Sequence, residues 1–324
     1  MPEQTKIAVT GATGFVGRTI LSQLETQNLP VTALARSQRG RDLKDGKNLR
    51  WITGGLDQPD ALAALVKGAG VVIHCAGATK ALNTHDFHRV NAMATGDLAR
   101  AAQNAGVRHF ILLSSLAATR PSVSDYAASK AAGEAAAMAE TATMALTTLR
   151  APAVIGPGDA ATAPLFSLIA RGWMPVLGKK ARTGRFSVID VQDLATLLID
   201  LACAPGKPAP HRILSPYGHR DLGWSDLKAS GARITGRRIR ELVLPETLAT
   251  LAGRGADFTA RMTRRAQVFS SGKLQEMRAG DWIGDTPLVT STPLDETMHR
   301  CLTPFLRVGN APKIDPSASH RKSE

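Results

Sequence analysis

Short apolar segments alternate with helical segments in the first half of this 324-residue chain, and this alternation constrains the fold most strongly. Runs such as KIAVT (6–10) and VVIH (71–74) have the length and the β-branched content of buried strands. Strands are predicted at 6–10, 31–36, 50–53, 71–74, 109–114 and 146–150, and helices at 15–27, 60–68, 90–105 and 125–141. Such alternation is typical of a parallel sheet covered by helices on both faces. With right-handed crossovers, the predicted fold is α/β, a doubly wound Rossmann sheet.

The second half differs in composition and periodicity. Proline and glycine cluster in PAVIGPGD, PAPH and SPYGH, and the helical pattern becomes irregular. We therefore expect a Rossmann domain over 1–155 and a smaller C-terminal substrate-binding lobe over 156–186 and 204–309. The strand-and-helix pattern of 187–203 is expected to return to the Rossmann sheet. The polar end of the chain, 310–324, is rich in Pro and Ser and is expected to be a loose tail.

The formal net charge of +13 points either to an anionic partner or to a solvated basic surface. Basic residues are scattered through the second half, and only 4% of all residues are aromatic. No helix-turn-helix, zinc-finger or aromatic-studded basic motif accompanies them, so the sequence argues against nucleic acid as a partner. An anionic membrane surface, a polyanionic substrate and a solvated face all stay open.

The cysteine and histidine patterns argue against disulfides and metal sites. Cys75, Cys203 and Cys301 are widely spaced with no C-x-x-C, and the histidines show no H-x-x-x-H pair. The chain also lacks a run of about 18 apolar residues and a basic leader before an apolar stretch. We therefore expect a cytoplasmic protein with no bound metal.

A glycine-rich turn directly follows the first predicted strand, where TGATGFVG (10–17) has the form G-x-x-G-x-x-G. A diphosphate can approach the backbone N–H groups at a helix N-terminus only where no Cβ blocks it. Because the motif ends a strand and opens a helix, it predicts a dinucleotide-binding site. The expected cofactor contacts in this turn are Gly11, Thr13, Gly14, Phe15, Val16 and Gly17.

The end of the second predicted strand favours NADP(H) over NAD(H) as the cofactor. An acidic residue there would hydrogen-bond the ribose 2′-hydroxyl of NAD. The chain instead has Arg36 and Ser37, with Arg39 and Arg41 close behind and no acid before Asp42. An arginine can bind a 2′-phosphate through charge-assisted hydrogen bonds. Arg36 and Ser37 are therefore expected to contact the 2′-phosphate of NADP(H).

A Y-x-x-x-K pair lies on the helix predicted at 125–141. The spacing of four puts Tyr126 and Lys130 on one face of that helix. Lys130 is expected to lower the pKa of Tyr126 from about 10 and to hydrogen-bond the nicotinamide ribose. Ser115, at the end of the fifth predicted strand, is expected to hold the substrate oxygen. These three residues form the candidate catalytic site, in which the cofactor carries the hydride and the protein supplies the proton.

With these motifs the chain resembles the extended short-chain dehydrogenases/reductases, the NAD(P)-dependent epimerase/dehydratase superfamily, over about residues 5–200. The segments that carry the resemblance are TGATGFVG, ALAALVKGAGVVIHCAG, VNAMATGDL, LLSSLAA, YAASKAAGE, LRAPAVIGPGD and IDVQDLA. The resemblance implies that the cofactor ribose and diphosphate are lined by Cys75, Ala76 and Gly77. It also implies that the nicotinamide lies beside Pro152, Ala153 and Val154.

One departure from the family pattern concerns the adenine site. The family commonly has G-D-L after the third strand, with the Asp at the adenine amine, where this chain has Gly54-Gly55-Leu56. Gly55 and Leu56 are still expected to lie beside the adenine. Asp57 comes two positions late, so the resemblance gives it only a weak claim to the same role.

Other departures narrow the reaction. Dehydratases of this family usually carry an Asp-Glu pair after the catalytic hydroxyl residue, whereas Leu and Ala follow Ser115 here. Sugar-nucleotide epimerases generally have Asn where this chain has Ala153, and an arginine where it has Phe186, although Arg185 is adjacent. The L-R-x-P pattern resembles instead the hydroxysteroid dehydrogenase and ketone-reductase branch. We therefore expect NADPH to reduce a ketone that Tyr126 protonates; nucleotide-sugar epimerisation and a non-catalytic NADP-binding role are the alternatives.

The C-terminal pattern bears on substrate and partners. Leu248, Leu251, Phe258 and Met262 recur at near-helical spacing, with arginines between them. Such a helix can rest on an anionic membrane or simply close the substrate cleft. Residues 269–285 resemble bacterial members of the reductase branch, some of which reduce lipid ketones of the 3-oxo-ceramide type. The resemblance implies a bulky, apolar, lipid-like or sterol-type substrate. The chain is expected to be a monomer or homodimer, and peripheral contact with the inner face of an anionic membrane stays open beside the cleft-closing role of this helix.

Overall fold

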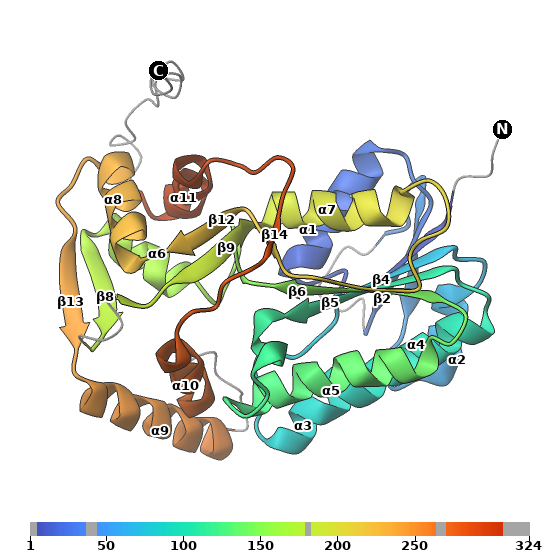
Figure 1. Ribbon diagram of the computed structural model, residues 1–324, viewed down its shortest axis with the longest axis horizontal. Helices are drawn as coiled ribbons and strands as arrows, with labels where there is room; N and C mark the ends of the chain where they lie inside the picture. The colour runs from blue at the N-terminus through green and yellow to red at the C-terminus, as the bar shows by residue number, and fades with distance from the viewer. Residues whose placement is uncertain (1–4, 37–43, 179–182, 264–269, 307–324) are drawn as a thin grey trace.

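The computed structural model describes residues 5–36, 44–178, 183–263 and 270–306 (Figure 1). Its main feature is a seven-stranded sheet of order β10-β6-β5-β4-β1-β2-β3, in which every pairing is parallel. The strands are β1 (Ile7–Thr10), β2 (Val31–Ala35), β3 (Leu49–Thr53), β4 (Val71–His74), β5 (His109–Ser115), β6 (Ala145–Ala151) and β10 (His211–Leu214). The order reverses between β1 and β4, as in dinucleotide-binding sheets, which confirms the predicted doubly wound Rossmann fold.

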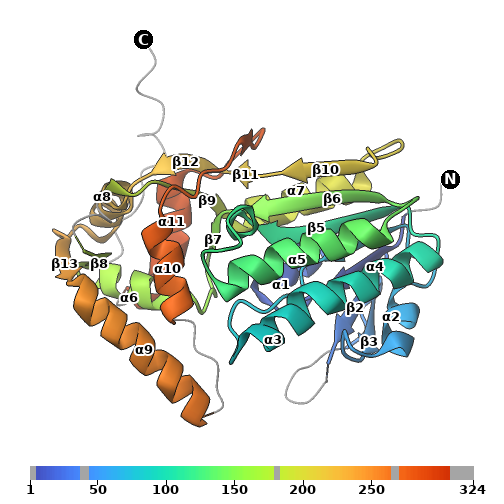
Figure 2. The ribbon, with the colours of Figure 1, turned by 60° about the horizontal axis from the view of Figure 1, so that its bottom comes forward.

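Helices cover both faces of this sheet (Figure 2). The helices are α1 (Phe15–Thr26) and α7 (Val191–Cys203) on one face, and α2 (Pro59–Val66), α4 (Ala94–Asn104) and α5 (Asp125–Glu140) on the other. Alternation along β1 shows how the strands supply both cores: Ile7 and Val9 pack under α1 and α7, while Ala8 packs under α2 and α4. Burial on both faces explains why these strands are almost continuously apolar.

The helix predicted at 90–105 begins earlier and is interrupted. It consists of α3 (Thr84–His88), a π-helical turn η1 (Arg89–Met93) and α4. The backbone of this turn lies against α5, because a Cβ at Gly133 would come 2.1 Å from the carbonyl oxygen of Asn91. Single π-helical turns are rare within helices and often occur at functional sites.

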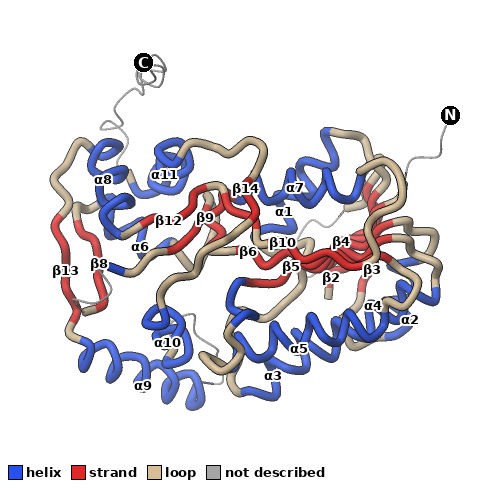
Figure 3. The backbone as a smooth tube through the Cα atoms, in the orientation of Figure 1, coloured by secondary structure: helices blue, strands red, loops and turns tan. Residues whose placement is uncertain are grey.

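The C-terminal part contains smaller sheets and its own core (Figure 3). Its strands are β7 (Ala153–Ile155), β8 (Trp173–Leu177), β9 (Phe186–Asp190), β11 (Pro216–Tyr217), β12 (His219–Leu222), β13 (Arg240–Leu244) and β14 (Thr286–Pro287). Its helices are α6 (Ala163–Ala170), α8 (Trp224–Thr235), α9 (Glu246–Thr263), α10 (Ser271–Ala279) and α11 (Leu294–Leu302), followed by the 3-10 turn η4 (Thr303–Phe305). Another 3-10 turn, η2 (Leu116–Thr119), follows β5 in the Rossmann part. The sheets have the orders β12-β9-β7, β13-β8 and β11-β14.

The segment 187–203 returns to the Rossmann sheet only in part, which corrects the expectation. The helix α7 packs against α1 on the large sheet, but β9 pairs with β7 and β12. Pro152 lacks the N–H that would continue the ladder, so β6 ends at Ala151 and β7 starts a second sheet that β9 joins. The seventh strand of the large sheet is β10, which was expected in the lobe. It pairs with β6 and forms the edge of the sheet.

Among the described residues, no helix is both long enough and apolar enough to cross a bilayer. The same residues contain no group of three His, Cys, Asp or Glu side chains placed to hold a metal ion. The predicted tail, 310–324, lies outside the described residues.

Candidate active site

The glycine-rich turn after β1 is packed too closely for larger residues. Gly11 has a φ of +69°, and a Cβ there would lie 2.6 Å from the Ala76 nitrogen. A Cβ at Gly17 would lie 2.1 Å from the Gly11 carbonyl oxygen, to which the Gly14 N–H donates at 2.8 Å. The start of α1 is therefore drawn against the carboxyl ends of β1 and β4.

The start of α1 is built to hold an anion. The first N–H groups of a helix have no partner within it, and they carry the positive end of its dipole. Gly14, at the N-cap position, has no side chain to accept from them, and no acidic residue lies in the first turn. Thr13, Phe15 and Val16 flank these N–H groups and are half-buried. These residues therefore fit the diphosphate of a dinucleotide.

Several other predicted cofactor contacts lie at the same edge of the sheet. Cys75, Ala76 and Gly77 directly follow β4, and the exposed Arg36 directly follows β2. The Gly54 N–H donates to the Ala35 carbonyl at 2.9 Å, which places the chain after β3 beside Arg36. The other cations predicted near the 2′-phosphate, together with Ser37, lie outside the described residues.

Asp57 occupies the space that a side chain at position 55 would take. A Cβ at Gly55 would lie 2.2 Å from Asp57 Oδ1, and the Gly55 N–H donates to Gln58 Oε1 at 3.0 Å. Leu56 is half-buried against the core beneath α2. A carboxylate is therefore present near the expected adenine site, although Asp57 stands two positions later in the sequence than the family pattern has it.

The side chains of Ser115 and Tyr126 lie close enough for the serine hydroxyl to act on the phenol. Ser115 ends β5, and Tyr126 lies in the first turn of α5, where Ser124 caps the helix by accepting from the Ala127 N–H at 3.0 Å. Burial raises the pKa of Tyr126 to about 12, although the nearby Ser115 hydroxyl lowers it, and Glu276 raises it further. The expectation of a lowered pKa is therefore wrong, because burial of the phenol disfavours the phenolate.

Lys130 lies one turn after Tyr126 on α5. Its Nζ donates to the Leu113 carbonyl at 2.8 Å, and a Cβ at Gly77 would lie 3.8 Å from this Nζ. Burial lowers the pKa of Lys130 to about 8, while Glu134 and Cys75 raise it. The ammonium therefore lies next to the segment after β4 that is expected to line the cofactor ribose.

The residues expected beside the nicotinamide follow β6. Ser115 pairs with Ala151 across β5 and β6, so Pro152 comes next to the end of β5. Pro152 and Val154 are half-buried, and Ala153 is exposed. The structure thus places the candidate hydroxyl residue and the expected nicotinamide segment on neighbouring strand ends.

Asn91 was not predicted as a site residue, yet its side chain connects the segment after β4 to the helix α5. Its Oδ1 accepts from the Ala78 N–H at 2.7 Å, and its Nδ2 donates to the Ala78 carbonyl and to Ser129 Oγ, both at 2.9 Å. Ser129 Oγ in turn donates to the Tyr126 carbonyl at 2.7 Å. A buried Asn inside a helical segment is the one local signal that could have pointed to this role.

Glu276 is a second residue that the sequence did not reveal. Ser124 Oγ donates to Glu276 Oε1 at 2.7 Å, and Lys273 Nζ lies 3.0 Å from Glu276 Oε2. Arg120 donates to the carbonyls of Ala279, the last residue of α10, and of the two residues after it, and also stacks on Trp282. Through these contacts α10 is fastened to the start of the helix that carries Tyr126.

A Rossmann sheet with a glycine-rich turn, combined with neighbouring Ser, Tyr and Lys side chains, is typical of nicotinamide-dependent oxidoreductases. Residues 7–212 match the NAD dependent epimerase/dehydratase family, which is more than half of the chain. The chain belongs to this family of extended short-chain dehydrogenases/reductases, whose cofactor is an NAD(P) nucleotide.

Comparisons with individual proteins agree with this membership. The chain is 38% identical to the ceramide reductase of Caulobacter vibrioides, over 90% of this chain and 88% of that protein. It is 25% identical to the UDP-glucose 4-epimerase of Vibrio cholerae, over 81% and 86% of the two chains. The structure of MoeE5 in complex with UDP-glucose and NAD has the same fold, with a TM-score of 0.68, 22% identity and coverage of 92% and 97%.

Proposed function

We propose that this chain is an NADPH-dependent reductase of a ketone on a bulky, lipid-like molecule, such as a 3-oxo-ceramide or a sterol-type ketone. The observation that carries the reaction type is the placement of the Ser115 hydroxyl beside Tyr126, one helical turn from Lys130, at the edge of the sheet where the glycine turn lies. The substrate class rests on the similarity to a ceramide reductase along 90% of the chain.

Tyr126 is the proposed proton donor. With a pKa of about 12 the phenol is protonated throughout the neutral range, so it can give its proton to the ketone oxygen. Ser115 would hold the same oxygen, since its hydroxyl already lies within hydrogen-bond reach of the Tyr126 hydroxyl. When bound, the nicotinamide cofactor supplies the hydride to the carbonyl carbon.

Lys130 and the strand ends would bind the cofactor. Lys130 Nζ, beside Gly77, can donate to the nicotinamide ribose, while the N–H groups at the start of α1 hold the diphosphate. Arg36, exposed at the end of β2, can pair with a 2′-phosphate, which supports NADP(H) over NAD(H). Asp57 can accept from the adenine amine.

The runner-up function is epimerisation of a nucleotide sugar, because a UDP-glucose 4-epimerase matches 81% of the chain. Ala153 argues against it, since it stands where the family's epimerases generally carry an amide side chain. A non-catalytic NADP-binding role is a third option, and the complete Ser115, Tyr126 and Lys130 set argues against that.

The test is an assay of the purified protein with NADPH and a 3-oxo-ceramide in mixed micelles, with UDP-glucose and UDP-galactose in parallel. We expect ketone-dependent NADPH oxidation and a Tyr126→Phe variant that loses about 100-fold or more of kcat. Tyr217→Phe alters the other tyrosine of the chain and is the matched control, which should keep the full rate. Arg36→Ala should raise the KM for NADPH about tenfold and leave the KM for NADH nearly unchanged.

Interconversion of the two UDP-sugars without net NADPH oxidation would establish the epimerase instead. Binding of NADPH with no turnover of either substrate class would favour the accessory role. We also propose that the protein acts in the cytoplasm, as a monomer or homodimer, and meets a membrane peripherally.

A further inference from the structure

The helix α9 exposes large apolar side chains to solvent and buries small ones against the protein. Leu248, Leu251 and Met262 are 57%, 63% and 70% exposed, while the small residues Ala249 and Ala260 are buried. Residues three and eleven positions apart fall on nearly the same side of a helix, so these large side chains form one outward stripe. The stripe does not serve the core of the lobe, which argues against the expectation that α9 is an ordinary helix closing a cleft.

The two-stranded sheet that leads into α9 also has an uncovered apolar face. Parallel pairing puts Trp173, Pro175 and Leu177 of β8 on the same side as Arg240, Leu242 and Leu244 of β13. Trp173 is 40% and Leu242 43% exposed, whereas the alternate residues Met174 and Val176 are buried in the core of the lobe. We call this face, together with the stripe of α9, the apolar end of the molecule.

Figures 1 and 2 place β8 and β13 at the end of the molecule remote from the large sheet, and α9 begins beside them and runs back toward α3 and α5. Five of the exposed large apolar side chains belong to this end: Trp173, Leu242, Leu248, Leu251 and Met262. Soluble surfaces rarely gather so many, so the cluster indicates a contact surface.

The charges around this end are mainly positive. The exposed arginines that border it are Arg171, Arg238, Arg240 and Arg254. Within the described part of the chain, none of them forms an ion pair with a carboxylate. Of the nearby acids, Glu241 pairs with Lys228 and Asp257 accepts from the Ser271 N–H, which leaves Glu246 as an exposed carboxylate.

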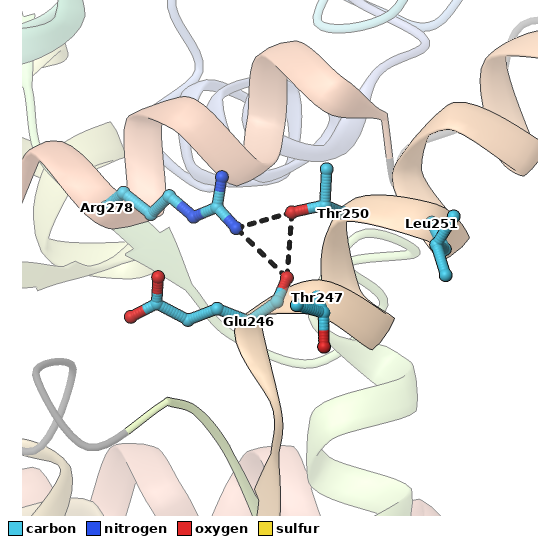
Figure 4. A pocket seen from close by; sticks show the side chains of 5 residues that line it. All are labelled: Glu246, Thr247, Thr250, Leu251 and Arg278. Carbon is cyan, nitrogen blue, oxygen red and sulfur yellow. Dashed lines mark hydrogen bonds between the residues drawn. The ribbon is translucent and has the colours of Figure 1, made fainter.

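A groove lies beside the stripe, between α9 and α10 (Figure 4). It holds about 600 Å³ and is lined by Glu246, Thr247, Thr250, Leu251 and Arg278. Arg278 spans it by donating to the Glu246 carbonyl at 3.2 Å and to Thr250 Oγ1 at 2.7 Å. The other wall, α10, is the helix whose Glu276 contacts Ser124 at the start of α5, so one short helix joins the apolar end to the catalytic helix.

We propose that the apolar end is the surface by which this protein docks on an anionic phospholipid bilayer. Apolar side chains ringed by arginines match the acyl region and the phosphate layer of such a bilayer. A second copy of the chain fits less well, because a two-fold contact would bring the same arginines face to face. The proposal deepens the proposed function, since a lipid ketone would then be met where it resides.

The test is sedimentation of the full-length protein with vesicles of phosphatidylglycerol and phosphatidylcholine, or of phosphatidylcholine alone, without cofactor or substrate. We expect binding to the anionic vesicles that weakens with salt and falls about tenfold or more in a Leu248→Ser, Leu251→Ser, Met262→Ser variant. Val289→Ser, at another fully exposed apolar residue, is the matched control and should bind as the wild type does.

Failure of the wild type to bind anionic vesicles overturns the proposal, as does equal binding by the triple variant. A concentration-dependent dimer that the triple variant abolishes, seen by analytical ultracentrifugation without vesicle binding, would assign this end to self-association. NADPH oxidation with a short, water-soluble ketone is measured alongside, because it should be equal in all variants. A wild type that turns over the ketone but does not bind vesicles counts against docking alone, whereas absent turnover counts against the reductase.

Discussion

Around Tyr126, burial and the Glu276 carboxylate act in the same direction, since both raise the pKa of the phenol. Glu276 belongs to α10, and its contact with Ser124 lies two residues from Tyr126 in the chain. This contact puts Glu276 at the start of α5, beside the helix turn that carries Tyr126. The lobe therefore helps to keep the proposed proton donor protonated, as ketone reduction requires.

Replacing Glu276 with Gln tests this coupling. The amide can keep the hydrogen bond to Ser124 but removes the negative charge, so the pKa of Tyr126 should fall. Alcohol oxidation with NADP needs the phenolate, which is the minor form below the pKa of about 12. The variant should therefore oxidise the alcohol faster than the wild type between about pH 7 and pH 10, with its rate profile displaced to lower pH.

A purely structural role for Glu276 predicts slower oxidation and slower reduction with no displacement of the profile, and that result would refute the coupling. Glu296→Gln removes an exposed carboxylate from α11 and is the control, whose profile should coincide with that of the wild type. Thermal unfolding of both variants separates a change in stability from the change in titration.

At the level of elements, the π-helical turn η1 and α5 touch through their backbones. Asn91 sits at this contact and links the segment after β4 to α5 by side-chain hydrogen bonds. The close approach depends on Gly133, where a Cβ would meet the Asn91 carbonyl oxygen at 2.1 Å. The helix that carries Tyr126 and Lys130 is therefore positioned by a contact that only glycine allows.

Gly133→Ala should force α5 and η1 apart. We expect a loss of about 1–3 kcal/mol in the free energy of unfolding, because the added methyl group meets backbone and not a movable side chain. Gly96→Ala, on α4, makes only an ordinary 3.4 Å contact with the Ala136 side chain and should be neutral or stabilising by up to about 1 kcal/mol. Urea unfolding of the two variants checks the difference, and equal midpoints would contradict it.

Elements with local signals could be predicted from the sequence, and contacts between distant segments could not. The strands β1 to β6 lie within about a residue of their predicted positions, because each is a short apolar run between turn residues. The prediction that β9 joins the large sheet was wrong, because the sequence of a single strand does not show which strand it pairs with. The Tyr–Lys spacing of the candidate site was visible, but the direction of the Tyr126 pKa was not, because burial depends on the whole fold. Glu276 meets Ser124 across 152 positions and leaves no local pattern.

For the whole molecule, buried histidines set the response to acid. Burial lowers the pKa of His74 to about 3 and that of His109 to about 4, against about 6.5 in an unfolded chain. Between these values the unfolded chain binds more protons than the folded protein, so stability present above about pH 6.5 is lost as the pH falls. Each histidine contributes up to about 1.4 kcal/mol per pH unit to this loss.

The urea midpoint should therefore fall between pH 7 and pH 5, and His109→Gln should flatten this dependence. His109 hydrogen-bonds the Thr147 hydroxyl at 2.8 Å and also meets the backbone of Leu201, and both are polar contacts that a glutamine side chain can make. A midpoint that does not change with pH, or a variant with the wild-type slope, would show that the two imidazoles do not control acid stability.

The path of the chain through the large sheet has a consequence for synthesis. The strand β6 is complete at Ala151, but its outer neighbour β10 begins only at His211, after β7, β8, β9 and α7 have been made. A nascent chain emerging from the ribosome therefore carries β6 as an open edge over some sixty further residues of translation. During that interval the backbone N–H and C=O groups on the outer side of β6 stay open to pairing with another chain.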